Sequence, residues 1–422
     1  MRENTIKRYS SSWRSSLRTA SQIRIADMAA GFGLMLVLAS AFRPTITAYM
    51  PIGVAYNLLD KCVSVALLFY PMVSRQNPSR ITMTVSLFCL VACLSSFINE
   101  NLTLDVILSY TRIALLTYYF EAQLERYPRR LLSVAFFVLA MICFWDTLSV
   151  MFYPNGLYQD VRYENEYHTA FLNGWVLGLK NNHILWFLSL DVVSSLLDWN
   201  KKKSLRPSFR TIICYVATIA TAIVMGSSTS SVVLLVMLVL LCSEPLVSRA
   251  SFIINPRNVC LTLLFIWAFL VFSSSVSLLN DFLMSLFGKD ATFSGRSLAW
   301  SETLRMFLDS PIVGYGMQTA AQRALALGSV EYVNAHNQIL ELLYMGGFPL
   351  FCVAAFLPSL VARPPIGTQA GDSHRLIVCM VFIALGIEML FEVIMTAPGF
   401  WFLLLLSHYG CVFIEREGGS CG

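Results

Sequence analysis

The chain has 422 residues, of which 56% are hydrophobic and 13% are charged, and its formal net charge at pH 7 is +5. The mean hydropathy is +0.64. This composition excludes an ordinary soluble domain of this length and is typical of a polytopic membrane protein.

Twelve apolar stretches approach the ~20 residues that a helix needs to cross a bilayer. We therefore predict an all-α fold of about twelve transmembrane helices, with a large extracytoplasmic loop that contains short amphipathic helices. The loop comprises residues 280–336, between the ninth and tenth predicted helices. The predicted spans lie approximately at residues 25–42, 54–73, 81–98, 104–121, 131–151, 181–199, 211–226, 229–247, 258–279, 337–358, 374–395 and 397–414.

Lysines and arginines support this layout because they accumulate in the cytoplasmic connections of membrane proteins. With the N-terminus inside, the cytoplasmic segments hold 21 of the 30 Lys and Arg residues, and the outer segments hold seven. This alternation predicts that the basic segment 1–24 and the tail 415–422 are cytoplasmic, whereas the loop 280–336 lies outside. The positive net charge is explained by the inner membrane surface and does not indicate nucleic acid.

Several charged residues lie within the predicted spans, where each costs about 2.5–3.5 kcal/mol on insertion scales. Glu388 and Glu392 are four residues apart and would share one helix face. Two interpretations remain open for this pair: a proton or cation path, or structural pairing with Lys61 or Arg112. The other charges at this depth are Asp60, Asp146 and Asp191.

The connection from about Tyr153 to Asn182 mixes aromatic residues with amides and acids. Such residues suit sugar rings, which present apolar faces and many hydroxyl groups, but they also occur in the aromatic belt of a membrane interface. Both interpretations stay open for the aromatics. The two cations of this connection, Arg162 and Lys180, are candidate ligands for a phosphate group.

The longest polar stretch runs from about Asn280 to Gly347. Long loops of this kind are usually functional. Trp300, Leu304, Phe307 and Leu308 fall on one helical stripe between residues 297 and 309, which predicts an amphipathic helix suited to a membrane face. Arg296 lies in or beside its first turn, where free backbone N–H groups favour an anion.

Three motifs in this stretch, in their order and spacing, resemble the O-antigen ligase and O-antigen polymerase family of integral-membrane glycosyltransferases. They are Ser294-Gly295-Arg296 with Trp300, Pro311-x-x-Gly314-Tyr-Gly316, and His336-Asn337 at the start of the next span. The chain departs from the family in two places. The Ser/Thr cluster 226–231 lacks an arginine, which leaves one phosphate ligand unassigned, and Gly346-Gly347 replaces a Gly-Ile-x-Gly turn, which we interpret as a local packing change.

The resemblance implies inverting glycosyl transfer from a polyprenyl-diphosphate-linked oligosaccharide, on the outer face of the cytoplasmic membrane of a bacterium. Polymerisation of polysaccharide repeat units is the first interpretation, and ligation of a glycan to a lipid or protein acceptor is the alternative. A secondary transporter or flippase is a further alternative of another class. The implied partners are the lipid-linked donor, a glycan or lipid acceptor, membrane lipids, a flippase and a chain-length regulator.

In this chemistry an acceptor hydroxyl attacks the anomeric carbon and the diphosphate leaves. Arginine suits the leaving diphosphate because its planar fork binds phosphate oxygens in pairs. We expect no metal and no cofactor. His336 would take the hydroxyl proton or orient the acceptor, since imidazole exchanges protons near neutral pH. The predicted residues are His336 and Arg296 for catalysis, Arg296, Arg162, Lys180 and Arg305 for the diphosphate, and Asn337, Gln338, Glu341 and Tyr315 for the acceptor or sugar.

Overall fold

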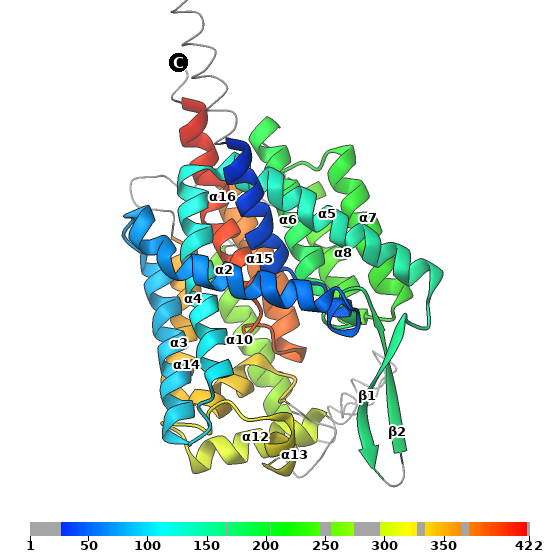
Figure 1. The fold of residues 1–422 in the computed structure, drawn as a ribbon, viewed down its shortest axis with the longest axis vertical. Helices are drawn as coiled ribbons and strands as arrows, with labels where there is room; N and C mark the ends of the chain where they lie inside the picture. Colours follow the sequence, from blue (N-terminus) through cyan, green and yellow to red (C-terminus); the bar gives the residue numbers. More distant parts are fainter. Residues whose placement is uncertain are drawn as a thin grey trace, which may run out of the picture.

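A computed structural model describes residues 27–165, 168–202, 204–244, 255–273, 296–326, 334–363 and 371–419. The side chains of residues 160–171, 273, 296–298, 320, 324 and 411–419 are not among the described ones. The chain forms a bundle of helices with a small sheet at one end (Figure 1). The predicted cytoplasmic segment 1–24 lies outside the described residues, as do Ser294 and Gly295 of the first motif.

Each of the twelve predicted spans contains a helix. Five of these helices, α2, α3, α5, α14 and α15, are long and apolar enough to cross a membrane, and four others are apolar but shorter. A mostly helical membrane protein is thereby confirmed, whereas the number of twelve crossings stays a prediction. The helices are Asp27–Ala41, α2 (Gly53–Ser74), α3 (Arg80–Ile98), α4 (Leu104–Arg126), α5 (Pro128–Phe152), α6 (Ile184–Lys202), α7 (Phe209–Val224), α8 (Ser228–Cys242), α10 (Pro256–Ser273), α14 (Gln338–Val361), α15 (Asp372–Phe391) and α16 (Pro398–Gly419).

A three-stranded antiparallel sheet departs from the all-α prediction. Its strands are β1 (Tyr158–Asn165), β2 (His168–Trp175) and β3 (Gly178–Leu179), in the order β1-β2-β3. Tyr158 pairs with Gly174. A Cβ atom at position 174 would lie 2.4 Å from the Tyr158 ring, so a larger residue there would displace that ring. The sheet occupies the connection in which the sequence indicated only an aromatic-rich loop.

Alternate connections of the bundle meet at one end, which we call the site end. The short 3-10 helix η1 (Thr45–Tyr49) contacts the sheet, because Ile46 N–H donates to the Val176 carbonyl at 3.1 Å. The Asn99 side chain after α3 donates to the Gly314 carbonyl at 3.2 Å. Helices α12 (Arg296–Asp309) and α13 (Ala320–Ala326) and the hairpin β1-β2 lie at this end (Figure 1). These are the connections that the charge count assigned to one side of the membrane.

The loop after α12 docks on a break in α14. Gly347 has a φ of 62°, which interrupts the helix. Tyr315 N–H donates to the Tyr344 carbonyl at 2.8 Å across this break. A Cβ atom at Gly314 would lie 2.5 Å from the Tyr344 carbonyl oxygen, and one at Gly347 would lie 2.5 Å from that of Pro311. The glycines of the two motifs therefore permit a close backbone approach that other residues would prevent.

Helix α12 is amphipathic, as predicted, but its buried face differs from the predicted one. Trp300, Thr303 and Met306 are buried, whereas Leu308 of the predicted apolar stripe is 67% exposed. Trp300 packs in a small apolar cluster with Leu340 of α14. The buried face of α12 therefore lies against protein rather than against a membrane.

Candidate functional site

His336 lies in a turn, residues 334–337, that leads into α14. Its φ of 43° is in the left-handed region, which residues other than glycine rarely adopt. The Asn334 side chain accepts the His336 backbone N–H at 2.8 Å, and the Asn337 side chain caps α14 by accepting the Leu340 N–H at 3.1 Å. The two asparagines thus fix the backbone on both sides of the histidine.

Buried contacts also hold the residue before His336. The Trp300 indole donates to the Ala335 carbonyl at 3.0 Å, and the Glu341 carboxylate accepts the Ala335 N–H at 3.0 Å. A strained backbone conformation costs about 1–3 kcal/mol and persists only where its surroundings enforce it, which is common at functional sites. The geometry of this turn therefore favours a functional role for the half-buried His336.

The two amides next to His336 are occupied by the fold. Asn337 and Gln338 are each 1% exposed. The Asn337 side chain donates to the Leu390 carbonyl at 3.1 Å, and the Gln338 side-chain oxygen accepts the backbone N–H groups of Ile394 and Met395 at 2.8 and 2.9 Å. These bonds join α14 to the end of α15, and the geometry does not support the predicted contact of either amide with sugar hydroxyls.

A carboxylate lies beside the His336 ring, and an amide contacts that carboxylate. His336 Nδ1 is 3.5 Å from Glu392 Oε2, and the side chains of His336 and Glu392 are 21% and 16% exposed. Glu392 Oε1 accepts a hydrogen bond from Asn181 Nδ2 at 2.7 Å. Glu392 follows α15, so it does not share a helix face with Glu388. This chain of contacts brings the connection 176–183 to the start of α14.

A buried contact between Asp146 and His183 fixes the turn that presents Asn181. Asp146 of α5 and His183 are both fully buried, with 2.9 Å between Asp146 Oδ2 and His183 Nδ1. Asp146 Oδ1 accepts the Leu177 N–H at 3.0 Å, and His183 Nε2 donates to the Gly178 carbonyl at 3.0 Å. The pair therefore holds both ends of the turn against α5.

Replacing Asp146 with alanine should lower the free energy of unfolding by about 3–5 kcal/mol, because it leaves a buried partner uncompensated. Thermal denaturation of the purified protein in detergent would measure this loss. Asp105→Ala, at an exposed position of α4, is the matched control and should change stability little. Equal melting temperatures for both variants would contradict the role assigned to the pair.

Glu341 belongs to a second buried cluster rather than to an open surface. It is 7% exposed, and its Oε2 accepts from Nη2 of Arg323, itself 3% exposed, at 2.7 Å. The Arg323 guanidinium lies 3.4 Å from the centre of the Tyr344 ring, and the Tyr315 ring stacks on Tyr344 at 5.1 Å. Glu341 and Tyr315, both predicted to contact the acceptor, are thus engaged in packing α13 and the 310–317 loop against α14.

The structure describes the side chains of two of the four cations predicted for a diphosphate, Lys180 and Arg305. Lys180 is exposed on the turn next to Asn181, at the site end. Arg305 is exposed on α12 and pairs with Glu302 at 3.0 Å and Asp309 at 3.4 Å. The hydrogen bond that Arg305 donates to Glu302 raises the pKa of Arg305. Arg296 is the first residue of α12, and its side chain and that of Arg162 lie outside the described part.

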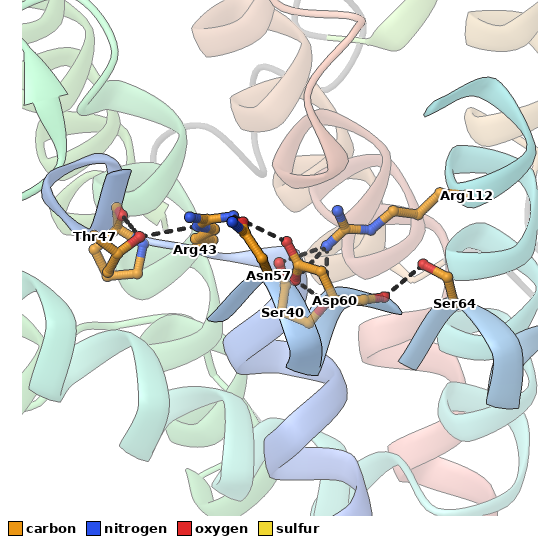
Figure 2. Close-up of polar contacts among 8 residues, drawn as sticks. Ser40, Arg43, Thr47, Asn57, Asp60, Ser64 and Arg112 are labelled. Atoms are coloured by element: carbon orange, nitrogen blue, oxygen red, sulfur yellow. Dashed lines mark hydrogen bonds and ion pairs between the residues drawn. The ribbon is translucent and has the colours of Figure 1, made fainter. Parts of the chain in front are cut away.

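Arg43 and Arg112 share the carboxylate of Asp60, as Figure 2 shows. The ion-pair distances are 3.4 Å to Arg43 and 3.3 Å to Arg112, and Ser40 also donates to Asp60 at 2.7 Å. This cluster ties α2 to α4 and to the end of the first helix. Among the described residues, Glu388 and Glu392 show no pairing with Lys61 or with Arg112, which pairs with Asp60 instead.

An apolar cavity of about 240 Å³ lies between α10, α14, α15 and α16. Trp267, Ile339, Leu390 and Met395 are among the residues that line it. The Trp267 indole also donates to the Asn337 side chain at 2.9 Å, so the cavity lies close to the His336 turn. Its lining suits a hydrocarbon chain.

Sequence reasoning missed the residues that contact Glu392, Asp146 and Glu341. No sequence motif singled out Asn181, His183 or Arg323 as partners. Two of them, Asn181 and Arg323, lie in connections that the charge count assigned to the outer side. The available signal was polar residues at the ends of apolar segments. That signal marks a boundary of the membrane, but it does not identify which side chains meet.

Comparison with known proteins gives one match. Residues 214–355, about one third of the chain, match the family model described as O-antigen ligase. The region begins in α7, ends in α14, and contains Arg296, the 311–316 loop and His336, which confirms the resemblance noted in the sequence. No curated protein and no solved structure matches the chain.

Proposed function

Because residues 214–355 carry an O-antigen ligase region, we propose that this protein is a membrane glycosyltransferase that moves a glycan from a polyprenyl diphosphate to a hydroxyl acceptor. The site end would face the outer side of the cytoplasmic membrane. The observation that carries this proposal is the strained, firmly held turn at His336, which lies within the matched region. Its position at an end of the bundle suits a donor whose sugar stands outside the bilayer.

In the proposed step the acceptor oxygen attacks the anomeric carbon, and the bond from that carbon to the diphosphate breaks. The electron pair of the broken bond leaves with the diphosphate, and the hydroxyl proton passes to Nε2 of His336. A single displacement inverts the configuration at the anomeric carbon. General-base assistance of this kind is typically worth ~10²–10⁴ in rate.

Cations and an apolar cavity would hold the donor. Arg296 stands at the N-terminus of α12, where free backbone N–H groups add to the attraction for an anion. Lys180 is exposed at the same end of the bundle and could contact the diphosphate or the acceptor. The cavity beside Trp267 would take part of the lipid tail. We propose repeat-unit polymerisation as the reaction, with ligation to a lipid or protein acceptor as the alternative.

Reconstitution in vesicles with a purified lipid-diphosphate oligosaccharide tests the proposal. Lengthening of the glycan without an added acceptor would support a polymerase. Transfer only to an added lipid or protein acceptor would support a ligase. Movement of the intact lipid-linked glycan across the bilayer, with no new glycosidic bond, would instead identify a flippase and overturn the proposal.

Turnover should not require a divalent cation, because a diphosphate held by arginine is already a good leaving group. Among the described residues, no group of three His, Cys, Asp or Glu side chains could hold a metal ion. The same vesicle assay in excess chelator should give an unchanged rate. A loss of turnover in chelator that magnesium or manganese restores would contradict this expectation.

A further inference from the structure

We propose that Glu392 is a positioning residue for His336, and that Asn181 in turn positions Glu392. This inference rests on the proposed function, because it assigns to Glu392 a role in the action of His336. Glu392 lies outside the O-antigen ligase region, which ends at residue 355. The site would therefore be completed by the connections 176–183 and 392–397.

The geometry directs one ring nitrogen of His336 toward a carboxylate. Nδ1 of His336 is 3.5 Å from Oε2 of Glu392. This distance is long for a hydrogen bond, but catalytic hydrogen bonds are often long without substrate and shorten in the reactive complex. The Nδ1 atom is buried and has no hydrogen-bond partner among the described residues. Glu392 supplies the nearby acceptor that a proton on Nδ1 requires.

A proton on Nδ1 leaves the lone pair of the neutral ring on Nε2. The described residues place no hydrogen-bond partner at Nε2 of His336, so that atom is available to a hydroxyl group. When the ring takes the acceptor proton it becomes a cation, and the Glu392 carboxylate stabilises that charge. A base that is oriented by a third group is the arrangement that nucleophile activation commonly requires.

Asn181 holds the carboxylate by its other oxygen. Its side-chain N–H group donates to Oε1 of Glu392 at 2.7 Å, while Oε2 lies 3.5 Å from Nδ1 of His336. The backbone N–H of Glu392 donates to the Glu388 carbonyl at 2.8 Å and fixes the residue to the end of α15. The turn that carries Asn181 is itself held by the buried Asp146–His183 pair.

Three single variants test the proposal in the vesicle assay. Glu392→Gln keeps the shape but removes the charge, and it should lower kcat about 10- to 100-fold, less than the ~10²–10⁴ of the base itself, with donor affinity unchanged. Asn181→Ala should lower kcat less, in the same direction. Glu388→Gln is the matched control, one turn earlier on α15, and should keep the original kcat. Melting temperatures within error of the unmodified protein would show that each variant is folded.

A double variant separates positioning from a merely structural role. If Glu392 acts through His336, then adding Glu392→Gln to His336→Ala should cause no further loss, because the two residues form one unit. Full additivity of the two losses, or a normal kcat for Glu392→Gln beside a weakened His336→Ala, would overturn this inference alone. Normal turnover of His336→Ala would instead overturn the proposed function.

Discussion

Replacing His336 with alanine is expected to lower the turnover of glycan transfer by ~10²–10⁴ while leaving donor binding nearly unchanged. The variant removes the group that accepts the hydroxyl proton, and alanine does not relieve the left-handed φ of 43° because it keeps the Cβ atom. The fold should persist because the hydrogen bonds of Asn334 and Asn337, which hold the turn, do not involve the His336 side chain. Initial rates at saturating donor would measure kcat, and titration with the lipid-linked donor would measure its affinity.

Acceptor concentration distinguishes the two roles left open for His336. If the ring only orients the acceptor, a higher acceptor concentration should restore much of the rate, whereas loss of a base cannot be restored in this way. Arg296→Lys is the contrasting variant, because it keeps the charge but loses the planar fork, and it should weaken both donor binding and turnover. Normal product from both variants would remove these two residues from the site.

Replacing Arg323 with alanine is expected to lower the free energy of unfolding by about 3–5 kcal/mol, since it leaves the buried Glu341 carboxylate without its cation. Arg323 Nη2 is 2.7 Å from Glu341 Oε2, and both side chains are almost entirely buried. The contact with the Tyr344 ring would be lost as well. Thermal denaturation in detergent would measure the change.

The double variant Arg323→Met/Glu341→Gln tests the cause of that loss. It removes both charges together, fills similar volume, and keeps an oxygen at position 341 to accept the Ala335 N–H. Most of the stability should return, because replacing a buried ion pair with neutral groups is often nearly neutral. A stable double variant that turns over normally would also exclude Glu341 as the base. A stable double variant that is inactive would instead assign Glu341 to the chemistry.

Helical segments and their alternation could be predicted because the signals are local. A run of apolar residues marks a helix by its length, and lysine and arginine counts mark the side on which each connection lies. A helix is present in each of the twelve predicted segments, with α4 and α5 extending several residues beyond the predicted ends. The sheet β1-β2-β3 was missed because its strands do not show the alternation of apolar and polar residues that predicts a strand. Its pairing depends on contacts between strands, such as Tyr158 with Gly174.

The motifs by themselves identified the part of the chain that matches a known family. The region that matches the O-antigen ligase family includes His336 and Gly314, which the sequence had singled out. Their physical roles differ, however, and the sequence could not separate them. A glycine is needed at position 314 because any Cβ atom there would clash with a backbone carbonyl of α14. His336 adopts a glycine-like φ without being glycine, as do Arg75 and Glu100 among the described residues.

The sequence by itself determined the membrane class, the helical segments and the position of His336, since each is encoded by neighbouring residues. Only the tertiary structure decided which side chains share a site. It placed Glu392 and Asn181, 211 positions apart in the chain, at 2.7 Å. It also paired Glu341 with Arg323. Such pairings follow from how the helices pack across the bundle. The identity of a side chain's partner across a packed interface is not encoded in the periodicity of a single sequence.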